Sequence, residues 1–357
     1  MSNILDILSS DLDSLTLNRN GLDERDLILL GDTNWAIVAI AFYELINKNG
    51  FLSTPDGVWE EIGRVWETDY ISALENKNPS QLLGLARNFF RNELSAGIVS
   101  HLLNRSQSGI DHESLNGKII CDLIACTKKH PEVQLSQLEI PPIGNPYGLA
   151  IGHHLIVPDA PRHFSHAKKI AQLTQDIEFP KILEIGAGYG GVLYMLQSLM
   201  GNKKFQYTIC DLECVLLIAL YFLQSCRTIR NWDRRISLVC NPGDLDSPEI
   251  ADADIVLIPA GMSEVLSCRK YDLVYNANSF SEMSLDTLKH YFDLINVIAE
   301  KYLFLMANTW ESYAFDKPIT RLTDFPIGAD YKVSEWSYAP WISGVGRSKE
   351  VVYERKQ

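Results

Sequence analysis

The sequence predicts an α/β fold in its C-terminal half, preceded by a helical N-terminal part. Two observations support this prediction. From Lys181 onward, short apolar runs alternate with helical runs, which is typical of a parallel sheet covered on both faces. The first apolar run also ends in a glycine-rich turn directly before a helix, as in Rossmann-like sheets. We place a helical part at 1–140, a connecting loop and helix at 141–173, and the sheet-containing part at 174–357.

The composition limits the class of protein. The 357 residues include 32 Lys+Arg and 45 Asp+Glu, a net charge of −13, which argues against nucleic acid as the main partner because phosphates need a cationic surface. Seven cysteines without a CxxC pair argue against a disulfide framework or a zinc site. The N-terminus is acidic and no apolar run is long enough to span a bilayer, so we expect a cytoplasmic protein without a membrane partner.

The N-terminal part should form a helical bundle. The nearly all-apolar run Trp35–Ile46 predicts a buried helix. Between Leu82 and Leu102, apolar residues recur at steps of three to five, and Ser80 suits the N-cap of that helix. This bundle either simply packs against the rest of the chain or also serves as a cap over a substrate pocket or as a homodimer surface.

The C-terminal elements follow in order after the turn-rich stretch 141–161 and a short helix, Arg162–Leu173. The predicted strands are Ile182–Ile185, Tyr207–Cys210, Ile255–Ile258, Leu273–Tyr275 and Tyr302–Met306. The predicted helices between them include Val192–Leu199, Glu213–Leu223 and Leu285–Ile298. A last pair of strands, Tyr331–Tyr338 and Glu350–Arg355, should close the sheet as a hairpin.

The glycine turn fits two ligand classes. Gly186, Gly188 and Gly191 satisfy the G-x-G-x-x-G fingerprint of dinucleotide sites. Gly186, Gly188 and Gly190, with Ala187 between the first two, equally satisfy the E/D-x-G-x-G-x-G turn of S-adenosylmethionine (SAM) sites. Both turns need glycine because the backbone bends tightly and the ligand approaches it closely.

The residues around the turn favour SAM over NAD. Glu184 stands two residues before Gly186, where a dinucleotide-binding strand is normally apolar, and an acid there suits the cationic methionine end of SAM. Asp211, 25 residues after Gly186 and followed by Leu212, ends the next strand and suits the two ribose hydroxyls, a role that both cofactors share. The closing hairpin is also typical of class I methyltransferases rather than dehydrogenases.

The segment from Tyr271 to Met283, YDLVYNANSFSEM, resembles the D-L-V-x-N-x-N-S-F-x-E-M segment of a family of bacterial sugar O-methyltransferases. The family's D-L-P-E element matches at 211–214 except that no proline follows Leu212, and its G-N-P element matches at 144–146. The resemblance covers roughly residues 80–357. It implies the class I SAM-dependent methyltransferase fold, SAM as the cofactor, and a sugar or glycosylated small-molecule or glycan acceptor.

The polar residues of this segment should lie over the cofactor, because ligands bind at the carboxyl ends of parallel strands. Asn276 and Asn278 are expected to contact the cofactor or the acceptor, although Asn278 could instead cap the next turn. Glu282 is a candidate catalytic base, an acceptor-binding carboxylate, or the partner of a buried cation.

Two further assignments depend on weaker patterns. His154, in the turn-rich stretch, is the first choice among the histidines for a base, with a structural or exposed role as the alternative. The adenine should lie at Pro259 and Ala260, with Asp244 as the other candidate. No ligand spacing indicates a metal. The alternatives to a sugar O-methyltransferase are a methyltransferase for a peptide or polyketide natural product, an NAD-dependent oxidoreductase, and a non-catalytic protein.

Overall fold

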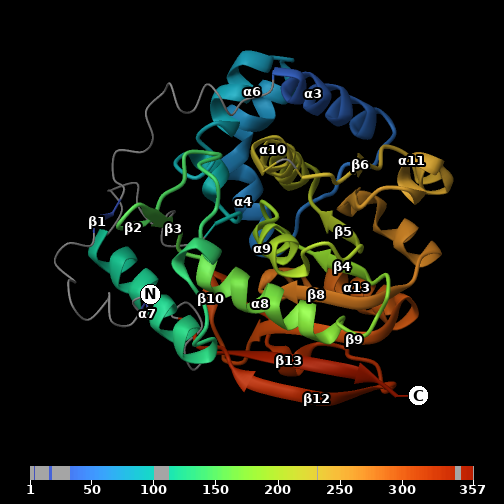
Figure 1. Cartoon of the computed structure of the whole chain (residues 1–357). Coiled ribbons are helices and arrows are strands. Elements are labelled where there is room, and N and C mark those ends of the chain that lie inside the picture. The colour runs from blue at the N-terminus through green and yellow to red at the C-terminus, as the bar shows by residue number, and fades with distance from the viewer. Residues whose placement is uncertain are drawn as a thin grey trace.

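The computed structural model describes residues 4, 16–17, 33–99, 112–230, 232–341 and 347–356. Its centre is an eight-stranded sheet in the order β12-β13-β9-β8-β4-β5-β7-β6 (Figure 1). The strands are β4 Lys181–Ile185, β5 Gln206–Asp211, β6 Ile236–Leu238, β7 Ile255–Pro259, β8 Tyr271–Ala277, β9 Ala299–Asn308, β12 Tyr331–Tyr338 and β13 Ser348–Arg355.

The direction of the strands defines the topology. The six strands from β6 to β9 are parallel, whereas β13 runs antiparallel between β9 and β12. After β4 and β5 the chain forms the edge strand β6, inserts β7 between β5 and β6, and then returns to build β8 and β9 on the other side of β4. The strand order therefore reverses between β4 and β8, and parallel sheets bind their ligands at such a switch point.

Helices cover both faces of this sheet. Right-handed crossovers that run in opposite directions from β4 place α9 Gly191–Met200 and α10 Glu213–Arg230 on one face and α13 Leu285–Ile298 on the other. Helix α8, Ala160–Leu173, packs beside α9 (Figure 1). The shorter segments are η6 Pro242–Asp246, α11 Pro248–Ala251, η7 Ala260–Cys268, α12 Ser279–Glu282, β10 Tyr313–Ala314, β11 Lys317–Pro318 and η8 Leu322–Asp324.

The N-terminal helices pack against α10, as the upper part of Figure 1 shows. The Trp35 indole donates a hydrogen bond to the Leu217 carbonyl at 2.9 Å, and the Tyr70 hydroxyl donates to the Cys214 carbonyl at 3.1 Å. The elements of this part are α3 Thr33–Lys48, α4 Val58–Trp66, η2 Glu67–Ile71, α5 Ser72–Glu75, α6 Pro79–Ala86, η3 Glu93–Ser95, α7 His112–Lys129 and η5 Leu135–Gln137. A small sheet of β1 Thr16–Leu17, β2 Leu149–Ile151 and β3 His154–Ile156 completes the fold.

The α/β prediction and the predicted strands are confirmed, with limits that differ by at most three residues. The helix predicted from Ser80 to Leu102 is wrong in two respects. It begins at Pro79 with Asn78 as its N-cap, because the Asn78 side chain accepts a hydrogen bond from the Gln81 N–H and proline suits the first helical position. It also ends at Ala86, and Leu102 lies outside the described residues. The domain limits and the homodimer stay predictions.

Candidate functional site

The glycine turn joins β4 to α9 at the switch point. Gly186, Gly188 and Gly190 have φ of 76°, 57° and 86°, in the left-handed region that glycine adopts without strain. A Cβ atom on Gly186 would also lie 2.0 Å from the Ser279 hydroxyl oxygen, so the turn and α12 approach too closely for any side chain. Backbone geometry therefore requires glycine at this turn.

Two adjoining hollows lie around the turn and share Trp59, Gly186, Asp211 and Ser279. The empty volume of the first hollow is about 820 Å³ and that of the second about 920 Å³, and both volumes include some open solvent. Side chains that line the first hollow include Arg162, His163, Glu184, Asn278 and Glu282. Residues that line the second include Leu52, Ser53, Pro55, Leu212, Ala260 and His290.

Glu184 is a buried carboxyl group in the wall of the first hollow. One oxygen accepts a hydrogen bond from the Tyr207 hydroxyl at 2.8 Å. Burial raises the pKa of Glu184 to about 8, since this one donor does not compensate for the loss of water and the nearby Asp211 adds negative charge. The hollow therefore contains an acid that ionises readily only when a positive charge is supplied.

Asp211 lies at the end of β5 and borders both hollows. Its two oxygens accept hydrogen bonds from the Gly188 N–H at 3.0 Å and from the Leu212 N–H at 2.8 Å. Burial nevertheless raises the pKa of Asp211 to about 7, although these backbone donors lower it in part. Asp211 thus fixes the glycine turn and keeps further acceptor capacity for a ligand.

The raised pKa of Glu184 predicts a pH-dependent stability. Between pH 4.5 and 8 this group is mainly protonated in the folded chain and ionised in the unfolded chain, so unfolding releases a proton. The free energy of unfolding should therefore fall as pH rises through this range, relative to that of Glu184→Gln, by up to about 1.4 kcal/mol per pH unit. Urea unfolding of both proteins at pH 5, 6, 7 and 8 measures this difference, and a constant difference would contradict the assignment.

Arg162 brings a cation to the first hollow and is held by a buried ion-pair cluster. Its guanidinium lies 3.3 Å from Asp159, and Lys118 lies 3.8 Å from Asp159 and 2.9 Å from Asp122. Burial alone would raise the pKa of Asp159, but the charges of Arg162 and Lys118 outweigh it and hold that pKa well below its usual range. The cluster therefore keeps a charged guanidinium in the wall of the first hollow.

His163 covers the first turn of α9. A Cβ atom on Gly191 would lie 2.3 Å from the Nδ1 of His163, and this nitrogen is 3.3 Å from the Tyr189 hydroxyl. Burial and the Arg162 charge lower the pKa of His163 to about 3, so its imidazole is neutral at physiological pH. The start of α9, where a dinucleotide fold holds its diphosphate, is thus occupied by a side chain.

The residues predicted from the segment Tyr271 to Met283 fall into two groups in the structure. Asn278 (φ 70°) and Glu282 line the first hollow. Asn276 lines neither hollow, because its amide group donates to the Ile185 carbonyl at 2.7 Å and to the Ser279 hydroxyl and accepts from the Phe280 N–H. Asn276 therefore ties the end of β4 to α12 and positions the lining residues indirectly.

The remaining predicted residues are placed as follows. Ala187 and Gly188 line the first hollow, and Leu212 and Ala260 the second, with Pro259 directly before Ala260 at the end of β7. Asp244 lines neither, since its carboxylate accepts the N–H groups of Cys240 and Asn241 in its own turn. His154 also lines neither hollow, lying on the β3 hairpin with Nδ1 3.0 Å from Glu139. Gly190 faces Leu223.

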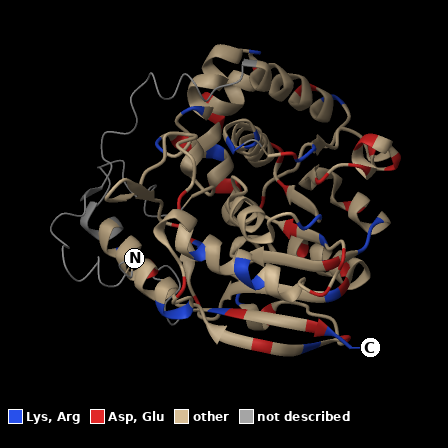
Figure 2. Cartoon of the chain, in the orientation of Figure 1, with Lys and Arg blue, Asp and Glu red and all other residues tan. Residues whose placement is uncertain are grey.

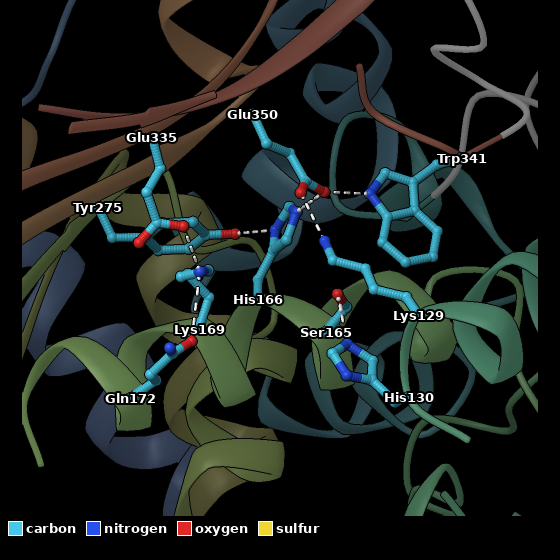
Figure 3. Close-up of polar contacts among 10 residues, drawn as sticks. All are labelled: Lys129, His130, Ser165, His166, Lys169, Gln172, Tyr275, Glu335, Trp341 and Glu350. Atoms are coloured by element: carbon cyan, nitrogen blue, oxygen red, sulfur yellow. Dashed lines mark hydrogen bonds and ion pairs between the residues drawn. The ribbon is translucent and has the colours of Figure 1, made fainter. Parts of the chain in front are cut away.

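A buried polar network braces the wall of the first hollow from behind (Figure 3). The Glu350 carboxylate accepts hydrogen bonds from Trp341 Nε1 at 2.8 Å and Lys129 Nζ at 2.6 Å and lies 3.0 Å from His166 Nε2. Because a carboxylate can only accept, Nε2 carries the proton and Nδ1 accepts from the Tyr275 hydroxyl at 2.7 Å. Through Tyr275 on β8, His166 on α8 and Glu350 on β13, the network holds α8 and β8 against the closing hairpin. Tyr275 also lines the first hollow, so the network supports the wall of that hollow.

Three further findings concern ligands and partners. Within the described ranges, no three His, Cys, Asp or Glu side chains gather in an arrangement suited to a metal ion. Figure 2 shows Lys and Arg interspersed with Asp and Glu over the described elements. Among the described helices, none is both long and apolar enough to cross a bilayer.

The last strand, β13, runs antiparallel and lies between β9 and β12. This strand order is that of the class I methyltransferase fold. In the sheet of a dinucleotide-binding dehydrogenase, by contrast, all strands are parallel. Magnesium protoporphyrin IX methyltransferase from Synechocystis with bound SAM matches with 12% identity over 54% of this chain and 80% of that one, TM-score 0.35. The CurJ carbon methyltransferase matches with 12% identity over 68% and 69%, TM-score 0.38. No family model and no curated protein matches the chain.

Sequence reasoning missed three residues of the site. Trp59 borders both hollows from the N-terminal part, and Arg162 and His163 reach the first hollow from α8. Arg162 carried no motif, and His163 was not distinguishable from the other histidines. One signal was available for the α8 pair: Arg162 and His163 are adjacent in the first turn of the helix that precedes the strand leading to the glycine turn.

Proposed function

We propose that the protein is a SAM-dependent methyltransferase that transfers a methyl group to a hydroxyl of a sugar or glycosylated metabolite. The observation that carries the proposal is the pair of buried carboxyl groups, Glu184 and Asp211, on either side of the glycine turn. Their raised pKa values favour a ligand with positive charge, which SAM carries on its sulfonium and amino groups. A dinucleotide diphosphate would instead face the carboxyl group of Glu184 and the imidazole of His163.

The residues that line the two hollows can be assigned to the methionine end, the ribose and the adenine of SAM. Glu184 suits the amino group of the methionine end and Arg162 its carboxylate, since both groups face the first hollow. Asp211, between the hollows, suits the ribose hydroxyls, and Leu212 and Ala260 suit the adenine in the second hollow. SAM supplies a methyl group already activated by the sulfonium, so the chain's task is to orient the acceptor oxygen and to receive its proton.

Glu282 is the best placed group to receive that proton. It is buried on α12 and lines the first hollow, whereas the pKa of Asp159 in the same wall is held well below its usual range, which makes that carboxylate a weak base. The low pKa of His163 makes its imidazole a weak base. We assign the catalytic role to Glu282 in preference to His154, which lies outside both hollows. The acceptor itself is inferred to be a small molecule or glycan, because the net charge of −13 disfavours a nucleic acid.

Glu282→Gln tests this assignment. The variant should bind S-adenosylhomocysteine (SAH) as tightly as the unchanged protein but transfer methyl groups about 10²- to 10⁴-fold more slowly, the usual contribution of a general base. The assay uses SAM labelled in the methyl group with a panel of glycosides and sugar nucleotides, and product masses show the methylated class. Full activity of the variant would show that Glu282 is not the catalytic base. Transfer only to peptide or acyl-carrier substrates would replace the sugar acceptor with the natural-product alternative.

A further inference from the structure

Residues 51–57, which connect α3 to α4 and which we call the strap, lie across the second hollow. Leu52, Ser53, Thr54, Pro55 and Asp56 all line it, together with Leu212 and Ala260. Ser53 in the strap lies 160 residues before Glu213, its hydrogen-bond partner just after β5. The N-terminal part thus supplies one complete wall of this half of the site.

The first end of the strap is fastened by Glu213, a buried residue at the start of α10. One carboxylate oxygen accepts from the Ser53 hydroxyl at 2.7 Å and from the Gly261 N–H at 3.2 Å, and the other accepts from the Ser53 N–H at 3.2 Å. A Cβ atom on Gly261 would lie 2.0 Å from the Phe51 carbonyl oxygen. The strap therefore rests directly on the loop after β7, which we assign to the adenine.

The second end is fastened by Asp56. Its carboxylate accepts a hydrogen bond from the Ser284 N–H at 3.1 Å and closer ones from the hydroxyls of Ser284 and Thr287, at the start of α13. The next residue, Gly57, has φ 59°, and a Cβ there would lie 2.4 Å from the Glu282 carbonyl oxygen. Asp56 thus joins the strap to the segment that carries the proposed base.

We propose that the strap forms the outer wall of the adenine-binding half of the cofactor site, and that Asp56 is a positioning residue that holds this wall closed. The side chains of Leu52 and Pro55 then face the adenine across from Leu212 and Ala260, while the carboxylates of Asp56 and Glu213 hold the two ends of the strap. This inference rests on the proposed function. It predicts that removing the Asp56 carboxylate shortens the time for which the cofactor product stays bound.

The test compares SAH binding by the unchanged protein, Asp56→Ala and Asn78→Ala. Asn78 is the control, because its side chain caps α6 of the N-terminal part and lines neither hollow. Asp56→Ala should release SAH at least about tenfold faster in stopped-flow displacement, with weaker binding by the same factor, since three hydrogen bonds to a carboxylate are lost. Asn78→Ala should release SAH at the unchanged rate.

The possible outcomes are distinguishable. If the unchanged protein does not bind SAH, the proposed function fails and the assignment of the strap to adenine falls with it. If the unchanged protein binds SAH and folded Asp56→Ala releases it at the same rate, only the strap proposal is overturned. Should Asp56→Ala not fold, Ser53→Ala, which removes a single hydroxyl from the Glu213 contact, carries the same prediction with a smaller acceleration of about threefold.

Discussion

Asp211→Asn is expected to weaken the binding of SAH by about 30- to 100-fold. In the unchanged chain both carboxylate oxygens accept backbone N–H groups, from Gly188 and Leu212. An asparagine can accept only one of these bonds and turns its NH₂ group toward the other donor, and it no longer offers a charged acceptor to the ribose hydroxyls. Losses of this kind cost about 2–3 kcal/mol when a charged partner is involved. Titration calorimetry with SAH measures the change.

Asp244→Asn is the matched control for this experiment. Asp244 also accepts two backbone N–H groups, those of Cys240 and Asn241, but its turn lies outside both hollows. Its two bonds end on one carboxylate oxygen, so an asparagine amide oxygen can keep both, and only Asp211→Asn should lose affinity for SAH. Equal affinities in the two variants would exclude Asp211 from the ribose site.

Glu350→Gln should destabilise the folded chain by about 3 kcal/mol, because breaking a buried ion pair typically costs about 3–5 kcal/mol. Glu350 is buried, and its carboxylate is shared among Trp341, Lys129 and His166 (Figure 3). Burial would raise the pKa of Glu350, but the His166 and Lys129 contacts outweigh it and hold that pKa well below its usual range. Replacing the charge leaves the Lys129 ammonium without a counter-charge in a partly buried site.

Glu335→Gln provides the comparison, because Glu335 pairs with Lys169 at 2.8 Å in the same region but is half exposed (Figure 3). An exposed pair contributes at most about 1 kcal/mol. Urea unfolding at neutral pH should therefore give a clearly larger loss in the free energy of unfolding for Glu350→Gln than for Glu335→Gln. A loss below about 1 kcal/mol for Glu350→Gln would show that the network does not stabilise the fold as proposed.

The sequence predicts the central sheet well because its signals are local. Buried parallel strands such as 255–258 are continuous apolar runs, and a strand that ends in alternating glycines directly before a helix is typical of a nucleotide-binding sheet. The edge strand β6 was missed because Ile236–Leu238 is short and only partly buried, so its pattern is weak. The cap at Asn78 was missed because Ser80 is an equally good cap by residue type and only the position of Pro79 distinguishes them.

The site is predicted less completely because its walls come from distant segments. Glu184 and Asp211 are found from their spacing to the glycine turn, which the local geometry fixes. His154 was chosen because the turn-rich loop that contains it was expected near the mouth of the cofactor site, but the β2–β3 hairpin places it away from both hollows. Trp59 and the strap reach the site only through packing against helices more than 150 residues away, which no local pattern encodes.

Titration calorimetry of the unchanged protein with SAH and, separately, with NADH tests the central claim most directly. Glu184 beside the glycine turn and the His163 imidazole over the start of α9 predict that SAH binds at one site per chain and that NADH, with its anionic diphosphate, produces no binding heat under the same conditions. Binding of NADH without binding of SAH would contradict this assignment and show that the glycine turn belongs to a dinucleotide-dependent enzyme.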